Sequence, residues 1–144
     1  MSAYEFTLTK NLTVGSAQDF IMRFNPPVPV RPGRVSVEAP RHVITVSECF
    51  MGGEDMRIGF GIHGFGIDAA ELQDKVFKAP VLGPSAGVSL KCWYNGDEPE
   101  GYRTGERLVI VAKFSGVRVS VEPGKIVVGG KSLTSGKGPI GGKL

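Results

Sequence analysis

Apolar and polar residues alternate along most of this chain, with the period of two that predicts β-strands. The alternation is found at 4–9, 20–24, 35–38, 41–50, 56–62, 87–95, 108–114 and 117–121, and 126–128 adds a last short run. In 87–95, for example, Val88, Leu90 and Cys92 fall on one face, and Lys91 and Trp93 fall on the other. The runs are short and are separated by turn-forming residues, which favours a protein of eight or nine strands.

Two of these runs predict a specific place in a sheet. The run at 41–50 has apolar side chains on both faces, Ile44, Val46 and Phe50 on one and Val43 and Cys49 on the other. We therefore expect it to form a central strand, covered on both sides. The runs at 108–114 and 117–121 are separated by Ser115 and Gly116, residue types that are frequent in turns. We expect these two runs to pair as a hairpin.

Two other segments interrupt the alternation. Four prolines within 25–33 exclude a central strand there and favour an extended, polyproline-like connection. Residues 68–77 instead predict a helix of two to three turns, with Asp68 as N-cap and Glu71 at the third helical position. The apolar stripe of this predicted helix consists of Ala69, Leu72 and Val76.

The chain has 144 residues, which is enough for one domain with a hydrophobic core. Its 21 glycines and 10 prolines fall between the apolar runs, as they do in all-β proteins. We therefore expect an all-β fold, a two-sheet β-sandwich of eight or nine strands with one short helix in a connection. A jelly-roll or Greek-key order of strands would suit this composition.

The net charge of +3 is concentrated at the C-terminal end. The last twenty residues contain four lysines and no acid, whereas the other 124 residues carry 13 basic and 14 acidic side chains. Because 129–144 is also rich in glycine, we expect a sandwich domain at 1–128 and a flexible tail at 129–144. Lys131, Lys137 and Lys143 are candidate contacts to nucleic acid, but so few cations would hold phosphate only weakly.

Three segments match the residue pattern of a known site motif but lack the secondary structure or spacing that the motif requires. Residues 83–87 match the nucleophile elbow of hydrolases, yet a strand follows the serine where a helix is required. Residues 59–64 match a dinucleotide-binding fingerprint, yet no acid follows about 20 residues later in a βαβ unit. Residues 129–132 lack the spacing of a phosphate loop. None of the three therefore indicates catalysis or nucleotide binding.

Aromatic residues flank an acidic loop at 97–100. Trp93 and Tyr94 precede this loop, and Tyr102 and Arg103 follow it. Aromatic rings on a β-scaffold can bind carbohydrate or protein ligands. We therefore take Trp93, Tyr94, Tyr102 and Arg103 as candidate interaction residues, with an ordinary solvated loop as the simpler interpretation.

The remaining chemistry-bearing residues predict no metal site, cofactor or catalytic group. His42 and His63 have no partners at metal-ligand spacing, and Cys49 and Cys92 are 43 residues apart, so we expect structural histidines and buried, reduced thiols. No apolar run is long enough for a membrane span, and the first residues do not resemble a signal peptide. We expect synthesis in the cytoplasm.

These observations favour a non-enzymatic structural or assembly protein that forms symmetric homo-oligomers and contacts other structural subunits. Small β-sandwiches with basic arms are common in virus particles, so a virion component (a capsid, decoration or spike protein) is the more specific hypothesis. The alternative is a binding module for carbohydrate or protein ligands. A third class, an enzyme whose site forms between subunits, has no candidate residue.

Overall fold

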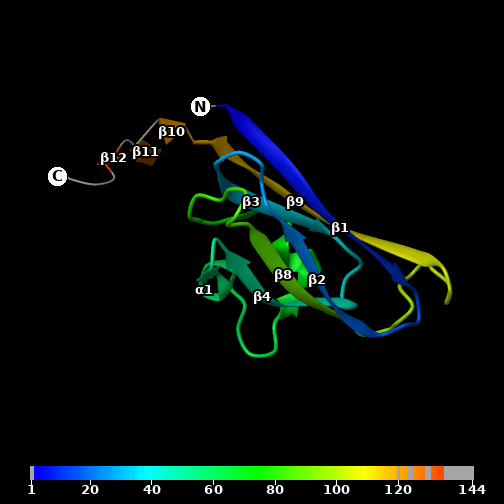
Figure 1. Ribbon diagram of the computed structural model, residues 1–144. Helices are drawn as coiled ribbons and strands as arrows, with labels where there is room; N and C mark the ends of the chain where they lie inside the picture. Colours follow the sequence, from blue (N-terminus) through cyan, green and yellow to red (C-terminus); the bar gives the residue numbers. More distant parts are fainter. Residues whose placement is uncertain (1, 120, 123–124, 129–130, 135–144) are drawn as a thin grey trace.

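The computed structural model describes residues 2–119, 121–122, 125–128 and 131–134. Two antiparallel sheets pack face to face (Figure 1). The first sheet contains β1 (Ala3–Thr13), β9 (Arg107–Arg118), β3 (Val30–Glu38) and β7 (Lys75–Val76), in that order. The second contains β2 (Gln18–Phe24), β8 (Val88–Tyr94), β4 (Ile44–Met51) and β5 (Glu54–Asp55), and β6 (Ile67–Asp68) also pairs with β4. The predicted two-sheet β-sandwich is confirmed.

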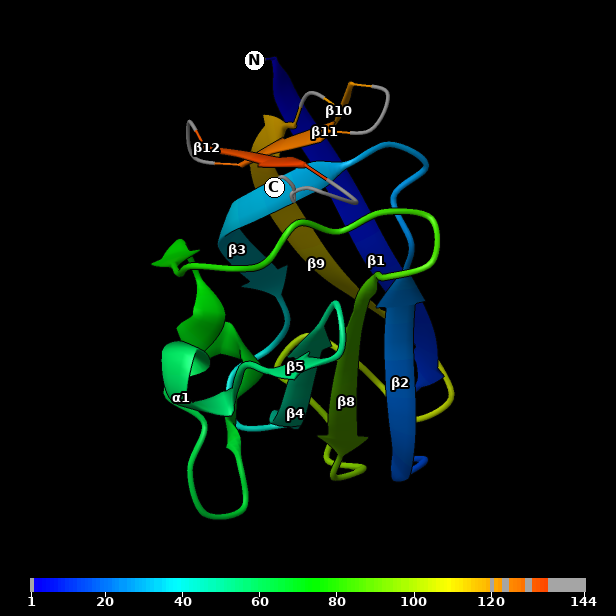
Figure 2. The same cartoon turned by 60° about the vertical axis from the view of Figure 1, so that its left-hand side comes forward.

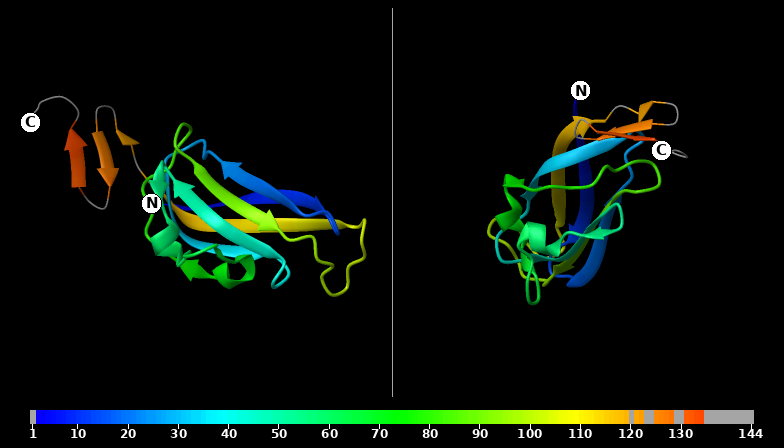
Figure 3. Two further views of the ribbon diagram at one scale, coloured as in Figure 1. Left: turned by 90° about the horizontal axis from the view of Figure 1, so that it is seen from below. Right: turned by 90° about the vertical axis from the view of Figure 1, so that its left-hand side faces the viewer.

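The strand order is that of a jelly roll. With β6 set aside, β1 pairs with β9, β2 with β8, β3 with β7, and β4 with β5. This nesting is what results when one long antiparallel hairpin is rolled up, and the rolling brings β9 against β3 and β8 against β4. The views in Figure 2 and Figure 3 show β1 and β9 in one layer and β2, β8 and β4 in the other.

The core lies between the two sheets and consists of the inward residues that the alternation predicts. On β8, Val88, Leu90, Cys92 and Tyr94 are all buried, as expected. Phe6 of β1 stacks on Phe114 of its own sheet, with 5.1 Å between ring centroids. It also stacks on Phe24 of the other sheet at 4.7 Å. Phe6 therefore joins the two layers, and offset aromatic stacking adds to the area that these rings bury.

The predicted turn at Ser115 and Gly116 is wrong, because β9 continues through both residues to Arg118. Gly116 pairs with Tyr4 of β1 on one side and with Pro32 of β3 on the other. A Cβ atom on Gly116 would collide with the carbonyl oxygen of Arg31 and with Pro32. Glycine is therefore required at this position because the backbones of β9 and β3 approach closely, and not because the chain turns there.

The proline-rich segment also departs from expectation, because Pro32 lies within β3 and not in a connection. The β3–β9 register shifts between Pro32 and Arg34, which identifies a local bulge. The described pairing of β7 with β3 involves only Arg34 and Val35. Pro32 therefore needs no backbone donor on that side, and a proline is tolerated.

The expected central position of the strand at 41–50 is confirmed, but its predicted faces are only partly right. β4 lies between β8 and the short strands β5 and β6. A register shift between Val46 and Glu48 inserts one extra residue into β4. Beyond this bulge Cys49 and Met51 point into the core, and Phe50 is only half-buried. Because a one-residue shift exchanges the two faces of a strand, the alternation predicted the wrong half of β4.

The strand predicted at 56–62 and the helix predicted at 68–77 are both wrong. Residues 56–62, expected as a strand, contain the only α-helix in the described part of the chain, α1 (Arg57–Phe60). Residues 68–77, expected as a helix, form one 3₁₀ turn, η1 (Ala69–Leu72), and then β7. The capping signal itself is correct, because the Asp68 carboxylate accepts a hydrogen bond from the Ala70 nitrogen at 3.1 Å. The helix ends early because β7 must return to pair with β3.

A separate three-stranded antiparallel sheet follows β9, formed by β10 (Val121–Glu122), β11 (Lys125–Val128) and β12 (Lys131–Thr134). β11 confirms the short strand expected at 126–128. Lys131 is the first residue of β12, while Lys137 and Lys143 lie outside the described residues. The division into a domain at 1–128 and a tail at 129–144 stays a prediction. No helix within the described segments has the length and apolar character needed to cross a membrane.

Candidate interaction site

Trp93 lies on the open face of the second sheet and is 41% exposed. It pairs with Asp19 of β2 and Thr45 of β4. Ile21, two residues after Asp19 on the same face of β2, is 47% exposed. Diagonal neighbours on adjacent strands are within reach of an aromatic side chain. Trp93 and Ile21 therefore form a small apolar area on this face.

Tyr94 does not share that surface, because successive side chains of a strand point to opposite faces. Its ring is fully buried. Its hydroxyl donates a hydrogen bond to the backbone oxygen of Asp97 at 2.6 Å and accepts one from the Gly15 nitrogen at 3.1 Å. Both polar functions of the phenol are thus used internally, and Tyr94 positions the loop after β8 against the β1–β2 turn.

Tyr102 and Arg103 belong to a loop that is held together by its own acids. The Glu98 carboxylate accepts hydrogen bonds from the backbone nitrogen and hydroxyl of Thr104, at 2.9 and 3.0 Å. Glu106 accepts one from the Arg103 nitrogen at 2.8 Å. The Tyr102 ring is partly buried against the core, and Arg103 is exposed. These two carboxylates therefore order the loop, and the four predicted residues do not converge on one site.

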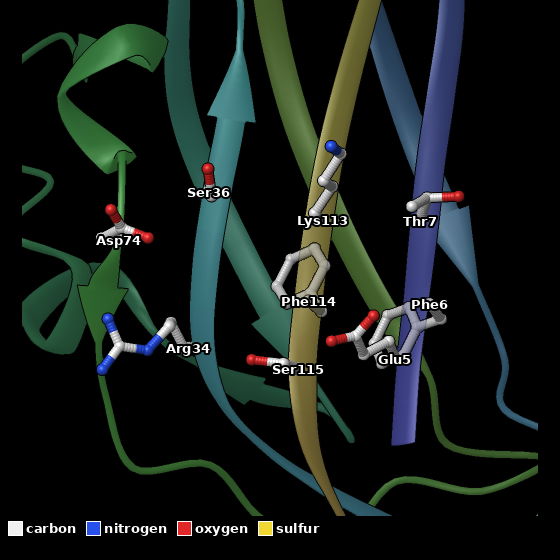
Figure 4. Close-up of a pocket in the computed structure, with 9 residues that line it drawn as sticks. All are labelled: Glu5, Phe6, Thr7, Arg34, Ser36, Asp74, Lys113, Phe114 and Ser115. Carbon is white, nitrogen blue, oxygen red and sulfur yellow. The ribbon is translucent and has the colours of Figure 1, made fainter. Parts of the chain in front are cut away.

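A groove of about 400 Å³, which the sequence analysis missed, lies on the outer face of the first sheet (Figure 4). Its lining comes from β1, β9, β3 and the residue before β7: Glu5, Phe6, Thr7, Lys113, Phe114, Ser115, Arg34, Ser36 and Asp74. The strand register sets Thr7, Lys113 and Ser36 side by side in one row. Only the pairing register brings these residues together, so no local sequence signal could have revealed the groove.

The groove is polar and electrically balanced, with Glu5 and Asp74 against Arg34 and Lys113. The Lys113 ammonium is 2.6 Å from a carboxylate oxygen of Glu38, and this hydrogen-bonded ion pair raises the lysine pKa above its ordinary value. No histidine or cysteine is among the lining residues, and Ser115 lies opposite Glu5 of β1. The arrangement can offer donors and acceptors to a polar ligand.

The two histidines lie elsewhere. His42 Nδ1 is 3.5 Å from an Asp68 oxygen, and the same carboxylate accepts a hydrogen bond from the backbone nitrogen of His42 at 2.8 Å. The His42 side chain is largely exposed. Since the Asp68 carboxylate also caps η1, it joins the connection before β4 to the start of η1. Within the described residues, no group of three or more histidine, cysteine, aspartate or glutamate side chains is arranged to hold a metal ion.

The two cysteines, Cys49 and Cys92, are free and buried in the core. Burial raises the pKa of each thiol from 9.0 to about 12, because the thiolate would lose its hydration. Nucleophilic cysteines in enzymes have the opposite shift, since it is the thiolate that reacts. Cys49 and Cys92 therefore have the properties of core residues.

Among the residues whose burial the structure describes, the most exposed apolar side chains lie between β5 and β6. Ile58 on α1 is 97% exposed, and Phe65 in the following loop is 100% exposed. Neither is needed to complete the core, which Phe60 and Ile62 enter from the same segment. Large apolar side chains in water are typical of surfaces that contact another molecule when several occur together.

Comparison of the chain with protein-family models, with curated proteins and with solved structures found no match. The function is therefore argued from the fold and the surfaces described above.

Proposed function

We propose that this chain is a non-enzymatic structural protein that assembles into symmetric oligomers. The observation that carries the proposal is the rolled-hairpin order of the strands, because jelly rolls recur as building blocks of assemblies, viral capsids among them. The same fold also occurs in lectins and cupins, so fold alone does not decide between these roles.

Two features of the surface support assembly over catalysis. No histidine or cysteine lines the groove, and both thiols are buried in the core. Ile58 and Phe65, in contrast, place two large apolar side chains almost entirely in water. Contact with a neighbouring subunit would remove this area from water, at about 25 cal/mol for each Å² buried.

The more specific proposal is a virion component, a capsid, decoration or spike protein. It rests on the jelly-roll order alone. If it holds, many copies would be arrayed on one particle, and weak contacts between them would gain collective strength. Neighbouring subunits or packaged nucleic acid would then be contacted by the C-terminal lysines, Lys131, Lys137 and Lys143.

Light scattering over a wide range of protein concentration tests the proposal, followed by electron microscopy of any assembly. We expect a defined oligomer that weakens when Ile58 and Phe65 are both replaced by serine. The matched control replaces Val76, an exposed apolar side chain on β7, with serine. A chain that stays monomeric at all concentrations, with or without these substitutions, would contradict an assembly role.

A second candidate is a binding module for carbohydrate or protein ligands, favoured by the exposed pair Trp93 and Ile21. Aromatic rings stack on the apolar faces of sugars and on protein side chains. A glycan array would test it with Trp93→Ala as the site variant and Tyr102→Ala as the control. Equal signals from both variants would remove Trp93 from any such site.

A further inference from the structure

The first strand, β1, leaves one entire edge unpaired. It pairs with β9 over eleven residues, from Ala3 opposite Val117 to Thr13 opposite Arg107. On its other side no strand of the described chain is hydrogen-bonded to it. Figure 2 shows β1 at the outer side of its layer, with β2 at the same side of the other layer. The edge is long for an exposed strand, since exposed edges are usually short or interrupted.

Two hydrogen bonds reveal which backbone groups face this free edge. The Arg118 nitrogen donates to the Ser2 oxygen at 2.8 Å, and the Val14 nitrogen donates to the Glu106 oxygen at 2.9 Å. In an antiparallel ladder, residues that bond to the partner strand alternate with residues that face away. The even-numbered residues of β1 therefore bond to β9. The odd-numbered residues direct their N–H and C=O groups to the free edge, where the Thr13 oxygen already accepts a hydrogen bond from the Ser16 nitrogen at 3.1 Å.

The odd-numbered residues also carry the exposed side chains of β1. They are Ala3, Glu5, Thr7, Thr9, Asn11 and Thr13. Of the features that usually protect an edge, β1 has no proline and its pairing with β9 has no bulge; its two charges are Glu5 on the outer face and Lys10 on the half-buried inner side. A threonine-rich edge of this kind is well suited to accept another strand.

We propose that the occupant of this edge is β1 of a second copy of the chain, antiparallel to the first and related to it by a two-fold axis. The inference rests on the proposed assembly role and adds a second contact surface to the one that contains Ile58 and Phe65. The register that overlaps all eleven residues places Leu8 opposite Leu8 of the second copy. The two four-stranded sheets then form one continuous sheet across the dimer.

This register is self-complementary in charge. It places Glu5 opposite Asn11, Thr7 opposite Thr9, and Ala3 opposite Thr13 of the second copy, because the numbers of paired residues sum to sixteen. Every one of these pairs joins two odd-numbered residues, so their side chains share a face, and the free backbone groups of Glu5, Thr7, Thr9 and Asn11 meet across the edge. No like charges oppose each other, and the amide of Asn11 can donate to the Glu5 carboxylate.

A pair of charge variants tests the register. Thr7→Glu/Thr9→Glu sets like charges opposite each other at both symmetry-related Thr7–Thr9 pairs, whereas Thr7→Glu/Thr9→Lys sets opposite charges there. Within one chain, residue 7 lies opposite Lys113 of β9, so a glutamate at position 7 faces a positive charge. We expect the first variant to raise the dimer dissociation constant at least about tenfold and the second to leave it within about threefold, as measured by sedimentation equilibrium. Thermal denaturation checks that both variants fold.

A second measurement uses the unchanged chain. Raising the protein concentration through the dimerisation range should slow amide hydrogen exchange at Glu5, Thr7 and Thr9. The neighbours Phe6 and Leu8, already bonded to β9, should change little. Oligomers that form equally well in both charge variants, or that leave these odd-numbered amides unprotected, would overturn the β1 interface while leaving the assembly role intact. A strictly monomeric chain would overturn both.

Discussion

The phenolic oxygen of Tyr94 accepts a hydrogen bond of 3.1 Å from the backbone nitrogen of Gly15, 79 residues earlier in the chain. The same hydroxyl donates to the Asp97 carbonyl. One side chain of the second sheet therefore ties the β1–β2 turn to the loop that leads from β8 to β9. Gly15 has a φ of +95°, and a Cβ there would lie 2.7 Å from Thr104, so the turn is matched closely to that loop.

Replacing Tyr94 with phenylalanine should lower the free energy of unfolding by about 1–3 kcal/mol. The substitution keeps the buried ring and removes only the hydroxyl, which leaves the Gly15 nitrogen and the Asp97 oxygen without this partner. Urea denaturation measures the change. Tyr102→Phe is the matched control, because its hydroxyl makes no hydrogen bond within the described residues and its loss should cost little. Equal effects of the two variants would contradict a role for the Tyr94 hydroxyl.

Replacing Gly116 with alanine should also destabilise the fold, by about 1–3 kcal/mol. The added Cβ would strike the Arg31 carbonyl and Pro32 of β3, so β3 would have to move away from β9. Gly83→Ala is the control, since a Cβ at Gly83 has no neighbour within 4 Å. Thermal denaturation compares the two. A Gly116→Ala protein as stable as its Gly83→Ala counterpart would show that the strands can separate at no cost.

Replacing Asp68 with alanine should cost about 1 kcal/mol, the usual effect of losing an N-cap. The carboxylate accepts hydrogen bonds from the backbone nitrogens of Ala70 and His42, so one deletion releases both η1 and the connection before β4. His42 has a φ of +69°, a conformation that needs such support in a residue other than glycine. Glu71→Ala, at an exposed position in η1, should change stability by less than about 0.5 kcal/mol in the same urea titration.

The buried thiols predict a loss of stability in alkali. Because burial raises the pKa of Cys49 and Cys92 from 9.0 to about 12, the folded protein keeps two protons that the unfolded chain releases above pH 9. The contribution of the protonated thiols to the free energy of unfolding is complete below pH 9. It is lost progressively between pH 9 and 12, at about 1.4 kcal/mol per pH unit for each thiol. Urea titrations at pH 7, 9 and 10.5 measure the slope.

The double variant Cys49→Ala/Cys92→Ala is the control for this slope, because lysines and tyrosines titrate in the same range. It should lose less stability than the parent between pH 9 and 10.5. Parallel pH curves for the parent and the variant would mean that the thiols do not contribute.

The alternation of residues predicted the sandwich and most of its core, because burial on one face of a strand imposes a period of two whatever the strand pairs with. It failed where the partner strand decides the local structure. The bulge in β4 exchanged the faces of Cys49 and Phe50, and the close approach of β3 explains Gly116 better than a turn does. The capping signal at Asp68 was correct, but propensity could not reveal that β7 ends the helix after one turn.

The interaction residues were harder to predict than the fold. Trp93 and Tyr94 are adjacent in sequence, yet the first is half in water and the second is fully enclosed. Sequence proximity grouped them, whereas strand geometry separates them. The groove beside Lys113 and the free edge of β1 depend on the pairing of strands about a hundred residues apart, which no local pattern encodes.

The nesting of the strands has a consequence for how the protein is made. β1 leaves the ribosome about a hundred residues before its partner β9, so during that interval β1 has no β9 to pair with. Pairings this distant in sequence also fold slowly, because a long loop must close before they form. In a nascent chain stalled before Arg107, both edges of β1 would be unpaired. Such a chain would be prone to aggregation, dependent on chaperones and sensitive to proteases until β9 is synthesised.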